Sequence, residues 1–289
     1  MGLIKRIAKF PTRILSDKGY VFLDYIRNLH SIPNLKQPKN FNEKLQYIKL
    51  YDHNPKYTKM VDKLAMREII KEKIGEGYTV PVLGIWNSFE EIDFNTLPDR
   101  FVLKCNHDSG SYIICPNKEL LDLDKAKKKI SIALKHNYYY QNREWIYKDI
   151  KPQVFAEQFL KDNETDFLWD YKFFCFHGKP RIMYVEQEAS DNKTAAFFDM
   201  DKNFLDLEMD DPRPSVPPEL PDCFDRMKDI SAVLSEGIPC LRVDFFVING
   251  KIYVGEMTFF HDGGFGKIRQ KEWNLRMGSW IDLSGIQKQ

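Results

Sequence analysis

Two carboxylates, Asp244 and Glu256, lie on the segment LRVDFFVINGKIYVGEMTFF (241–260), whose β-branched and aromatic residues on either side of a glycine predict a β-hairpin. A simple two-residue turn would put the two carboxylates on opposite faces of that hairpin. We therefore expect a three-residue loop with Gly250 in the left-handed conformation. This loop pairs Arg242 with Glu256 and leaves Asp244 on the diagonal.

In this register the polar residues of the hairpin share one face, which holds Arg242, Asp244, Glu256 and Thr258. The other face is apolar and holds Leu241, Val243, Phe245, Val247, Tyr253, Met257 and Phe259, with Gly255. Converging carboxylates repel each other unless a cation lies between them, and hard oxygen ligands suit Mg²⁺ held jointly with a phosphate. A cross-strand ion pair between Arg242 and Glu256 on a solvated face explains the same residues without a ligand. The hairpin alone leaves both interpretations open.

Three lysines stand near possible anion sites, although isolated lysines are usually solvated. Lys104 interrupts the apolar strand FVLKCN, just before a Ser-Gly-Ser turn (109–111) whose backbone N–H groups suit an anion. Lys63 follows Asp62 at the start of a helical region, and Lys172 lies on the strand DYKFF. One glycine in a loop is a weak phosphate signature, so this pattern needs support from elsewhere.

Other polar residues carry weaker signals. Glu157 interrupts the strand VFAEQFL, where it either faces solvent or accepts a hydrogen bond from an adenine amino group. His107, His177 and His261 lack metal-ligand spacing and are interpreted as polar loop residues, with His107 and His261 near a cleft. Cys105 has no identifiable base beside it, so we expect a small buried residue rather than a nucleophile.

Composition excludes several classes. The 289 residues include 43 Lys+Arg and 42 Asp+Glu, a net charge of +1, with 43% hydrophobic residues. These values describe a folded, near-neutral protein and disfavour a disordered chain or a generally basic nucleic-acid binder. The longest charge-free run, 78–89, is too short to span a bilayer. Five widely spaced cysteines indicate reduced thiols and a cytoplasmic location.

The expected elements alternate between helices and short strands. Residues 1–18 form a basic amphipathic start that either packs on the domain or rests on an anionic membrane surface at its inner face. Helices are expected at 58–74, 122–137 and 222–237, single strands at 79–86, 101–106, 111–115 and 154–160, and hairpins at 171–188, 194–208 and 241–260. The Pro-rich segment 210–222 is expected to be an extended connection.

The ordered set Asp62-Lys63, FVLKCNHDSGS, FAEQFL, DYKFFCFHGK and the 241–260 hairpin resembles the ATP-grasp superfamily, and more narrowly its TupA-like branch from bacterial surface-polysaccharide gene clusters. The resemblance covers about residues 35–285. It implies an α+β ATP-grasp fold in which two subdomains with mainly antiparallel sheets grip ATP. The expected limits are a helical lead segment at 1–60, a first subdomain at 61–153 and a second at 154–289.

The resemblance also assigns roles to residues. It implies that the ATP phosphates contact Lys63 and Lys104 and that a lid at 107–111 closes over them through His107, Ser109, Gly110 and Ser111. The adenine is expected at the hinge strand, which holds Glu157, Gln158, Phe159 and Leu160, and the ribose at Glu164 or Asp166. Mg²⁺ is expected on Asp244, Glu256 and Thr258, where many relatives have asparagine at the third position. Arg242 and Lys172 are expected to steady the transferred phosphoryl group. The acceptor pocket is expected from segments 199–225 and 260–270.

The implied activity is that of an ATP- and Mg²⁺-dependent carboxylate–amine ligase that works through an acyl phosphate. Its substrates would be an amino acid or other amine and a sugar acid of a capsular or other surface polysaccharide precursor. Two alternatives stay open: a sugar kinase with the same ATP site, and a non-catalytic ATP-binding component of a polysaccharide assembly complex. The sequence indicates no oligomeric state.

Overall fold

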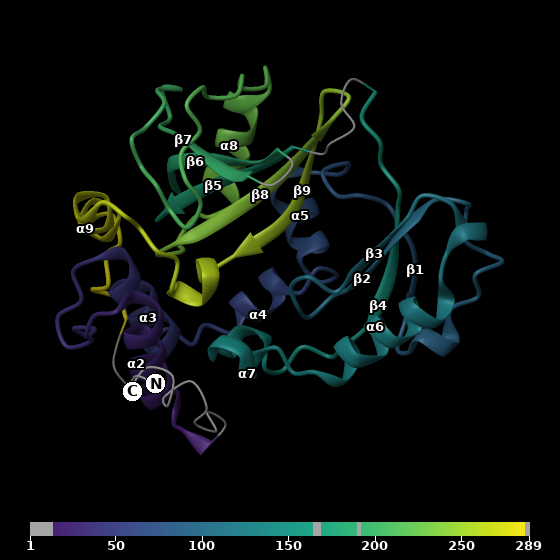
Figure 1. Ribbon diagram of the computed structural model, residues 1–289, viewed down its shortest axis with the longest axis horizontal. Helices are drawn as coiled ribbons and strands as arrows, with labels where there is room; N and C mark the ends of the chain where they lie inside the picture. The colour runs from purple at the N-terminus through teal and green to yellow at the C-terminus, as the bar shows by residue number, and fades with distance from the viewer. Residues whose placement is uncertain (1–13, 164–168, 190–191, 287–289) are drawn as a thin grey trace.

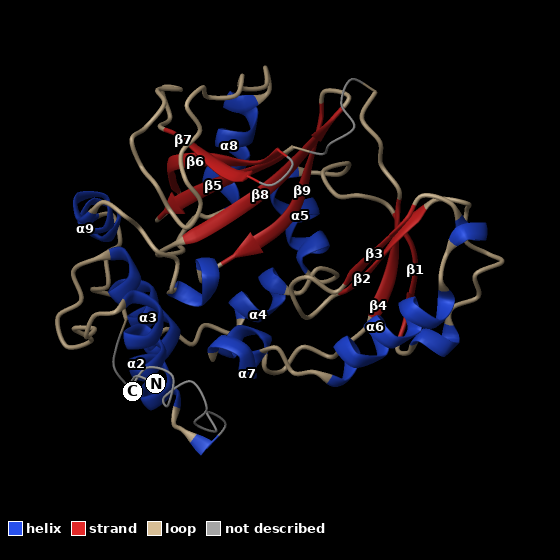
Figure 2. Cartoon of the chain, viewed as in Figure 1, coloured by secondary structure: helices blue, strands red, loops and turns tan. Residues whose placement is uncertain are grey.

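The computed structural model describes residues 14–163, 169–189 and 192–286. The described chain forms two antiparallel sheets that lie at an angle to each other (Figures 1 and 2). The smaller sheet has the order β1 (Val82–Trp86), β4 (Val154–Gln158), β2 (Phe101–Cys105) and β3 (Tyr112–Cys115). The larger has the order β7 (Asn192–Phe198), β6 (Lys179–Ala189), β5 (Asp170–Phe176), β8 (Leu241–Ile248) and β9 (Lys251–Thr258). The expected α+β class with antiparallel sheets is confirmed.

Helices cover the sheets and link them. The α-helices are α2 (Asp17–Leu29), α3 (Phe41–Tyr51), α4 (Lys56–Val61), α5 (Met66–Ile74), α6 (Leu123–Lys135), α7 (Tyr139–Asn142), α8 (Phe224–Leu234) and α9 (Lys271–Ser279). Short 3-10 turns are η2 (Phe89–Glu91), η3 (Lys118–Leu120), η4 (Trp145–Tyr147) and η5 (His261–Gly264). Within the described ranges, none of these helices is long and apolar enough to cross a membrane.

Each sheet has its own hydrophobic core. In the smaller sheet, Phe101, Leu103 and Cys105 alternate along β2 and pack with Ile130 of α6. In the larger sheet, β5 lies between β6 and β8 and is buried on both faces. Its Phe173 contacts Phe224 of α8 on one face, while Phe174 contacts Phe41 of α3 on the other. The leading helices therefore share the core of the larger sheet.

Strand β4 changes the predicted subdomain limit. We expected the second subdomain to begin at residue 154, but β4 lies between β1 and β2 in the smaller sheet. The chain therefore moves to the larger sheet only in the connection between Gln158 and Asp170. The reason is that Val154 and Ala156 are buried against the core of the smaller sheet. The other limits stay predictions, and the membrane-surface expectation for 1–18 falls mainly outside the described residues.

The helix expected at 58–74 is two helices, because the chain breaks at Asp62. Its backbone is extended there (φ −71°, ψ 112°), and its side chain accepts a hydrogen bond from the backbone N–H of Leu64 at 2.9 Å. The backbone N–H of Lys63 donates to the carbonyl of Asn106 at 3.1 Å. This break takes Lys63 out of the helix and places it beside the loop that follows β2.

The hairpin register differs from our expectation. Asn249 and Gly250 form a two-residue turn, both with positive φ (50° and 74°), the geometry that suits a tight hairpin. A β-bulge between Asp244 and Phe245 leaves Gly255 unpaired. This extra residue returns Asp244 and Glu256 to the same face of the hairpin, whereas the tight turn alone would put them on opposite faces. Asp244 therefore faces Glu256 directly.

The bulge changes which residues share a face nearer the turn. Arg242 faces Thr258, not Glu256, although the four polar residues do share one face as expected. Ile252 and Val254, rather than Tyr253, pair with Val247 and Phe245. A Cβ on Gly255 would approach the Phe246 ring to 2.5 Å, so the bulge position favours glycine.

Candidate active site

A cavity of about 210 Å³ lies between the two sheets. It brings together the two parts of the chain that the sequence analysis singled out. The smaller-sheet side contributes Lys63, Lys104, Cys105, Asp108, Ser109, Gly110, Ser111 and Tyr112, and the larger-sheet side contributes Asp170, Asp244, Phe246, Gly255 and Glu256. Cations therefore face carboxylates across a gap, as expected of a site for an anion held jointly with a metal ion.

Each of the two lysines that line the cavity is held by only one or two partners. Lys104 Nζ lies 2.6 Å from Glu157, which Arg67 also contacts at 3.4 Å. Lys63 donates to the carbonyl of Asp108 and lies 3.9 Å from Glu256. Both lysine side chains keep some exposure, 27% and 16%. Each ammonium can therefore turn toward a bound anion by giving up one contact.

An apolar strip of the smaller sheet adjoins Lys104. Cross-strand pairing aligns Ile85, Phe155, Lys104 and Tyr112 in one row on the same face. Ile85 and Tyr112 are each 49% exposed, and the neighbouring Ile114 is 56% exposed. A flat apolar surface beside a cation suits a purine base joined to phosphates.

The carboxylates form the opposite wall. Asp244 is 4% exposed and faces Glu256 across the hairpin. Asp170 lines the same cavity, with one oxygen 2.6 Å from Lys172 and the other, Oδ1, buried without a hydrogen-bond partner among the residues that the structure describes. Burial and then the charge of Asp244 raise the pKa of Asp170 to about 6. An orphaned carboxylate oxygen among three acids fits a divalent cation.

Asp170 was not a predicted ligand, whereas Thr258 was. The signal available in the sequence was its position two residues before Lys172 on a strand, which places both on one face. Thr258 instead accepts a hydrogen bond from Arg242 at 3.2 Å and lines a neighbouring cavity. On the larger-sheet side, the carboxylates of the first cavity are thus Asp170, Asp244 and Glu256, and Asp108 is a fourth carboxylate that lines it from the smaller-sheet side.

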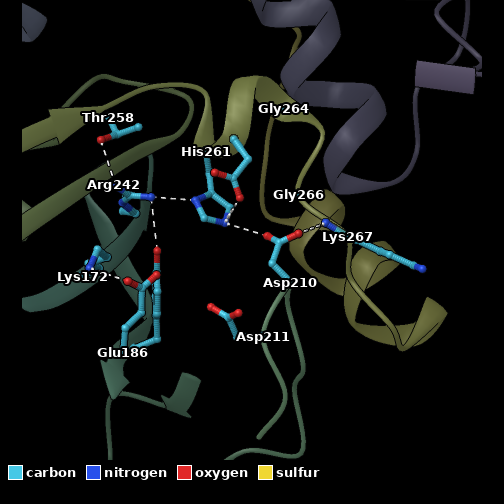
Figure 3. A network of polar contacts seen from close by, with 12 residues as sticks. Lys172, Glu186, Asp210, Asp211, Arg242, Thr258, His261, Gly264, Gly266 and Lys267 are labelled. Carbon is cyan, nitrogen blue, oxygen red and sulfur yellow. Dashed lines mark hydrogen bonds and ion pairs between the residues drawn. The ribbon is translucent and has the colours of Figure 1, made fainter. Parts of the chain in front are cut away.

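Every N–H donor of Arg242 is engaged, and Figure 3 shows its contacts with Thr258 and His261. Nε and Nη2 form a bidentate pair with Asp244 at 2.7 and 2.6 Å, and Nη2 also donates to Thr258. Nη1 donates to the Tyr184 hydroxyl at 3.2 Å and to His261 Nδ1 at 2.6 Å. Burial opposes its charge, yet Asp244 and the groups behind it hold the pKa of Arg242 well above its usual value. In this arrangement Arg242 orients Asp244 and has no spare N–H for a phosphoryl group.

His261 is buried, at 8% exposure, rather than an open loop residue. Because Nδ1 accepts from Arg242, the neutral ring carries its proton on Nε2, which lies 3.5 Å from Asp210 and 3.4 Å from Asp262. The three side chains are close enough to hold a metal ion, but a protonated Nε2 cannot ligate one. Figure 3 shows His261 joining Arg242 to Asp210, whose other oxygen accepts from the Lys267 backbone N–H.

Lys172 is 6% exposed and is fixed inside the carboxylate wall. It lies 2.6 Å from Asp170 and 3.6 Å from Glu186, with its ammonium over the Tyr184 ring. It does not line the cavity between the sheets. Its geometry is therefore that of a residue that holds Asp170 in place.

Several predicted nucleotide contacts lie away from the cavity. His107 is buried, with Nε2 at 3.1 Å from the Ala133 carbonyl. Gln158, Phe159 and Leu160, at the end of β4 and just beyond it, do not line the cavity, and Glu157 is paired with Lys104 instead. Glu164 and Asp166 lie outside the described residues. Burial raises the pKa of Cys105 to about 12, as expected of an inert thiol.

A second cavity of about 260 Å³ shares Ser109 and Glu256 with the first. Its other lining residues are Tyr138, Gln141, Asn142, Glu144, Tyr147, Arg242, Thr258, Phe260, Asp262 and Gly263. The 260–270 segment, one of the two from which an acceptor pocket was expected, lines this cavity through Phe260, Asp262 and Gly263, and its use as an acceptor pocket stays a prediction. The 199–225 segment does not line it, and the 138–147 segment, which does, was missed because it carries no motif.

Comparison with known proteins identifies the family of this chain. The family described as TupA-like ATPgrasp matches residues 43–282. No curated protein sequence matches.

Similar solved structures are ATP-grasp ligases or D-alanine–D-alanine ligases. They include D-alanine–D-alanine ligases from Bacillus anthracis (20% identity, TM-score 0.41, covering 69% of this chain and 57% of that one) and Helicobacter pylori (13%, 0.40, 77% and 58%). The ATP-grasp ligase PsnB with its minimal precursor is also similar (11%, 0.42, 72% and 54%). The chain thus spans less than two thirds of each of these proteins. On the family match over 43–282, the chain belongs to the TupA-like ATP-grasp family.

Proposed function

We propose that this protein is an ATP-dependent carboxylate–amine ligase that forms an amide bond through an acyl phosphate. The observation that carries the proposal is the cavity between the sheets, where Lys63, Lys104 and the 109–111 turn face Asp170, Asp244 and Glu256. Membership of the TupA-like ATP-grasp family supports it. ATP is a substrate of this reaction, so its phosphates belong on the lysine wall.

The protein residues contribute positioning and charge. A substrate carboxylate attacks the γ-phosphorus of ATP and ADP leaves, after which an amine displaces phosphate from the acyl carbon. Lys63 and Lys104 neutralise phosphate charge, and the backbone N–H groups of the Ser-Gly-Ser turn add hydrogen bonds. Because phosphoryl transfer needs little covalent help from the protein, such pre-positioned charge is the main catalytic contribution.

Mg²⁺ fits the carboxylate wall. Asp244 and Glu256 would hold it, with Asp170 in place of, or in addition to, Thr258, because Asp170 has the unpartnered oxygen. When bound, the ion supplies charge neutralisation for the phosphates.

The substrates are proposed as a class. The carboxylate is a sugar acid of a capsular or surface polysaccharide precursor, and the amine is an amino acid or a similar small amine. Family membership and the polar lining of the second cavity support this choice. A cytoplasmic location is part of the same proposal.

Thermal unfolding with and without Mg·ATP tests the nucleotide site. A ligand at about 100 times its dissociation constant adds roughly 2.7 kcal/mol, which moves the midpoint of a chain of this size by several degrees at about 2–4 °C per kcal/mol. We expect this shift in the wild type and a smaller one in Glu256→Gln. No shift in either protein with millimolar nucleotide and metal would contradict the proposal.

Hydroxylamine trapping tests the reaction class. An acyl phosphate formed from glucuronate, or from a precursor that carries it, yields a hydroxamate together with ADP. A sugar kinase would release ADP and leave a stable sugar phosphate without hydroxamate. ATP binding without ADP release from any combination of uronic acid and amino acid would favour a non-catalytic component.

A further inference from the structure

The second cavity has a buried carboxylate that the proposed nucleotide site does not use. Glu144 lies directly before η4 and is 4% exposed, yet it lines the cavity. Its carboxylate accepts one long hydrogen bond, from Asn142 at 3.4 Å, and within the described ranges it makes no ion pair within 4 Å. Neither Glu144 oxygen is among the described atoms that are fully buried without a partner, so the carboxylate is accessible from the cavity, where a ligand can complete its surroundings.

Lys49 of α3 is the cation with the largest electrostatic effect on Glu144. It is 2% exposed and donates to the carbonyl of Asn142 at 2.9 Å and to that of Gly263 at 2.6 Å. Asn142 and Gly263 both line the cavity, whereas Lys49 does not, so the Lys49 ammonium links two lining segments from outside the cavity. Lys49 is thus committed to backbone carbonyls and does not neutralise Glu144 directly.

The charges around Glu144 come from four elements. Lys49 on α3 and Arg242 on β8 are positive, while Glu256 on β9 and Asp262 on η5 are negative. Burial is the largest effect and raises the pKa of Glu144, Lys49 opposes it, and Glu256 and Asp262 add to it. Since Arg242 is already paired with Asp244, the groups left facing the cavity are mainly acidic.

The size and lining favour a small polar ligand. A volume of about 260 Å³ is below the range of drug-sized pockets, roughly 300–1,000 Å³. Tyrosine, amide and threonine side chains line it together with the carboxylates. The cavity adjoins the proposed nucleotide site through Ser109 and Glu256, so a ligand here reaches the position of the activated carboxylate.

We propose that this cavity binds the amine substrate as its ammonium ion, and that Glu144 accepts the proton that the ammonium must lose before its nitrogen can attack. The inference rests on the proposed ligase function. The Glu144 carboxylate first takes one proton from the ammonium ion, which frees the nitrogen lone pair. The amine nitrogen then bonds to the acyl carbon, the bond from that carbon to the phosphate oxygen breaks, and phosphate leaves with the electron pair and takes up the second proton that the nitrogen loses. Glu144 is neutral until it returns its proton to water.

The raised pKa of Glu144 supports this role. A carboxylate that holds a proton more tightly than usual is a better acceptor for an ammonium ion near neutral pH. An ordinary carboxylate, with a pKa near 4.3, would accept the same proton far less readily.

Glu144→Gln separates the two half-reactions. Hydroxylamine is a neutral nucleophile near pH 7 and needs no proton acceptor to trap an acyl phosphate, whereas an amino acid does. With ATP, Mg²⁺ and glucuronate as probes, we expect hydroxamate formation by Glu144→Gln within about threefold of wild type. Amide formation with the common amino acids should fall by about 10²–10⁴-fold, the usual contribution of acid–base catalysis.

The pH profile and two further variants complete the test. Amide formation by Glu144→Gln should rise about tenfold per pH unit below the pKa of the amine, because free amine replaces the lost acceptor. Glu144→Asp should recover part of the rate, and Glu119→Gln, an exposed glutamate, should match wild type. The Mg·ATP thermal shift of each variant checks that it is folded.

Each remaining outcome is decisive. Equal loss of hydroxamate and amide in a Glu144→Gln protein that still binds Mg·ATP would overturn the role of Glu144 and leave the ligase proposal standing. Unchanged amide formation would do the same. No hydroxamate from the wild type would overturn the ligase proposal and, with it, this inference.

Discussion

The two walls of the cavity are built in opposite ways. On the smaller sheet, Lys63 and Lys104 keep part of their surface exposed and each depends on one or two contacts. On the larger sheet, Arg242 has five donors engaged and holds Asp244 in a bidentate pair at 5% side-chain exposure. The lysine wall can rearrange around an arriving anion, whereas the Arg242–Asp244 pair of the carboxylate wall is fixed before any ligand binds.

This contrast has a physical cause. Lys104 lies on a sheet face where Ile85, Tyr112 and Ile114 stay about half exposed, and its own side chain keeps 27% exposure with Glu157 as its ion-pair partner. On the carboxylate wall, Asp170 and Glu256 keep 31% and 26% side-chain exposure, but Asp244 lies on the inner strand β8 and is only 5% exposed. Charges buried there persist only when they are paired and hydrogen-bonded. We therefore expect substitutions on the carboxylate wall to cost stability and those on the lysine wall to cost nucleotide affinity.

The largest effect is expected from Arg242→Met. Removing the guanidinium leaves Asp244 buried without its partner, which typically costs about 3–5 kcal/mol. The unfolding midpoint should fall by several degrees to well over ten, at about 2–4 °C per kcal/mol. Denaturant unfolding of the variant without ligands measures this loss.

The double variant Arg242→Met/Asp244→Leu serves as its control. It removes both charges and should regain much of the lost stability. An Arg242→Met protein as stable as the wild type would mean that the carboxylate wall is not held in the way described.

A smaller, purely functional effect is expected from Lys104→Met. Losing one cation that contacts phosphate should weaken Mg·ATP binding by about 10–100-fold, the range of a charge-assisted contact worth about 1.5–3 kcal/mol. Its stability should change by less than about 1 kcal/mol, because the pair with Glu157 is partly exposed. Calorimetric titration with a non-hydrolysable ATP analogue measures the affinity, with Lys127→Met as the exposed control.

A loss of several kcal/mol of stability in Lys104→Met would erase the contrast between the two walls.

The smallest effect distinguishes Asp170 from Thr258. If the unpartnered oxygen of Asp170 faces the cation, Asp170→Asn should weaken Mg²⁺ binding by about tenfold, an effect of about 1.4 kcal/mol. Thr258→Val should change it by less than about threefold, because its hydroxyl is already engaged by Arg242. Mn²⁺ binding in the presence of nucleotide, followed by electron paramagnetic resonance, gives both numbers. The reverse order would restore Thr258 as a ligand.

The sequence predicted which residues gather at the site better than it predicted how they are arranged. Alternation along 241–260 correctly grouped Arg242, Asp244, Glu256 and Thr258, because side chains two residues apart share a face. It failed on their pairing, because the bulge at Gly255 depends on how β9 packs rather than on the turn. It also missed the helix break at Asp62, since that break is stabilised by Asn106, which is 44 residues away.

What the sequence determined by itself was the α+β class, the TupA-like ATP-grasp resemblance and the residue types of the two walls. Period-2 patterning and local turn signals carry that information within single segments. Only the tertiary structure decided that Arg242 is saturated, that Asp170 joins the carboxylates, and that Glu144 and Lys49 lie at a second cavity. Those facts depend on contacts between segments about 50 to over 200 residues apart, which no local pattern records.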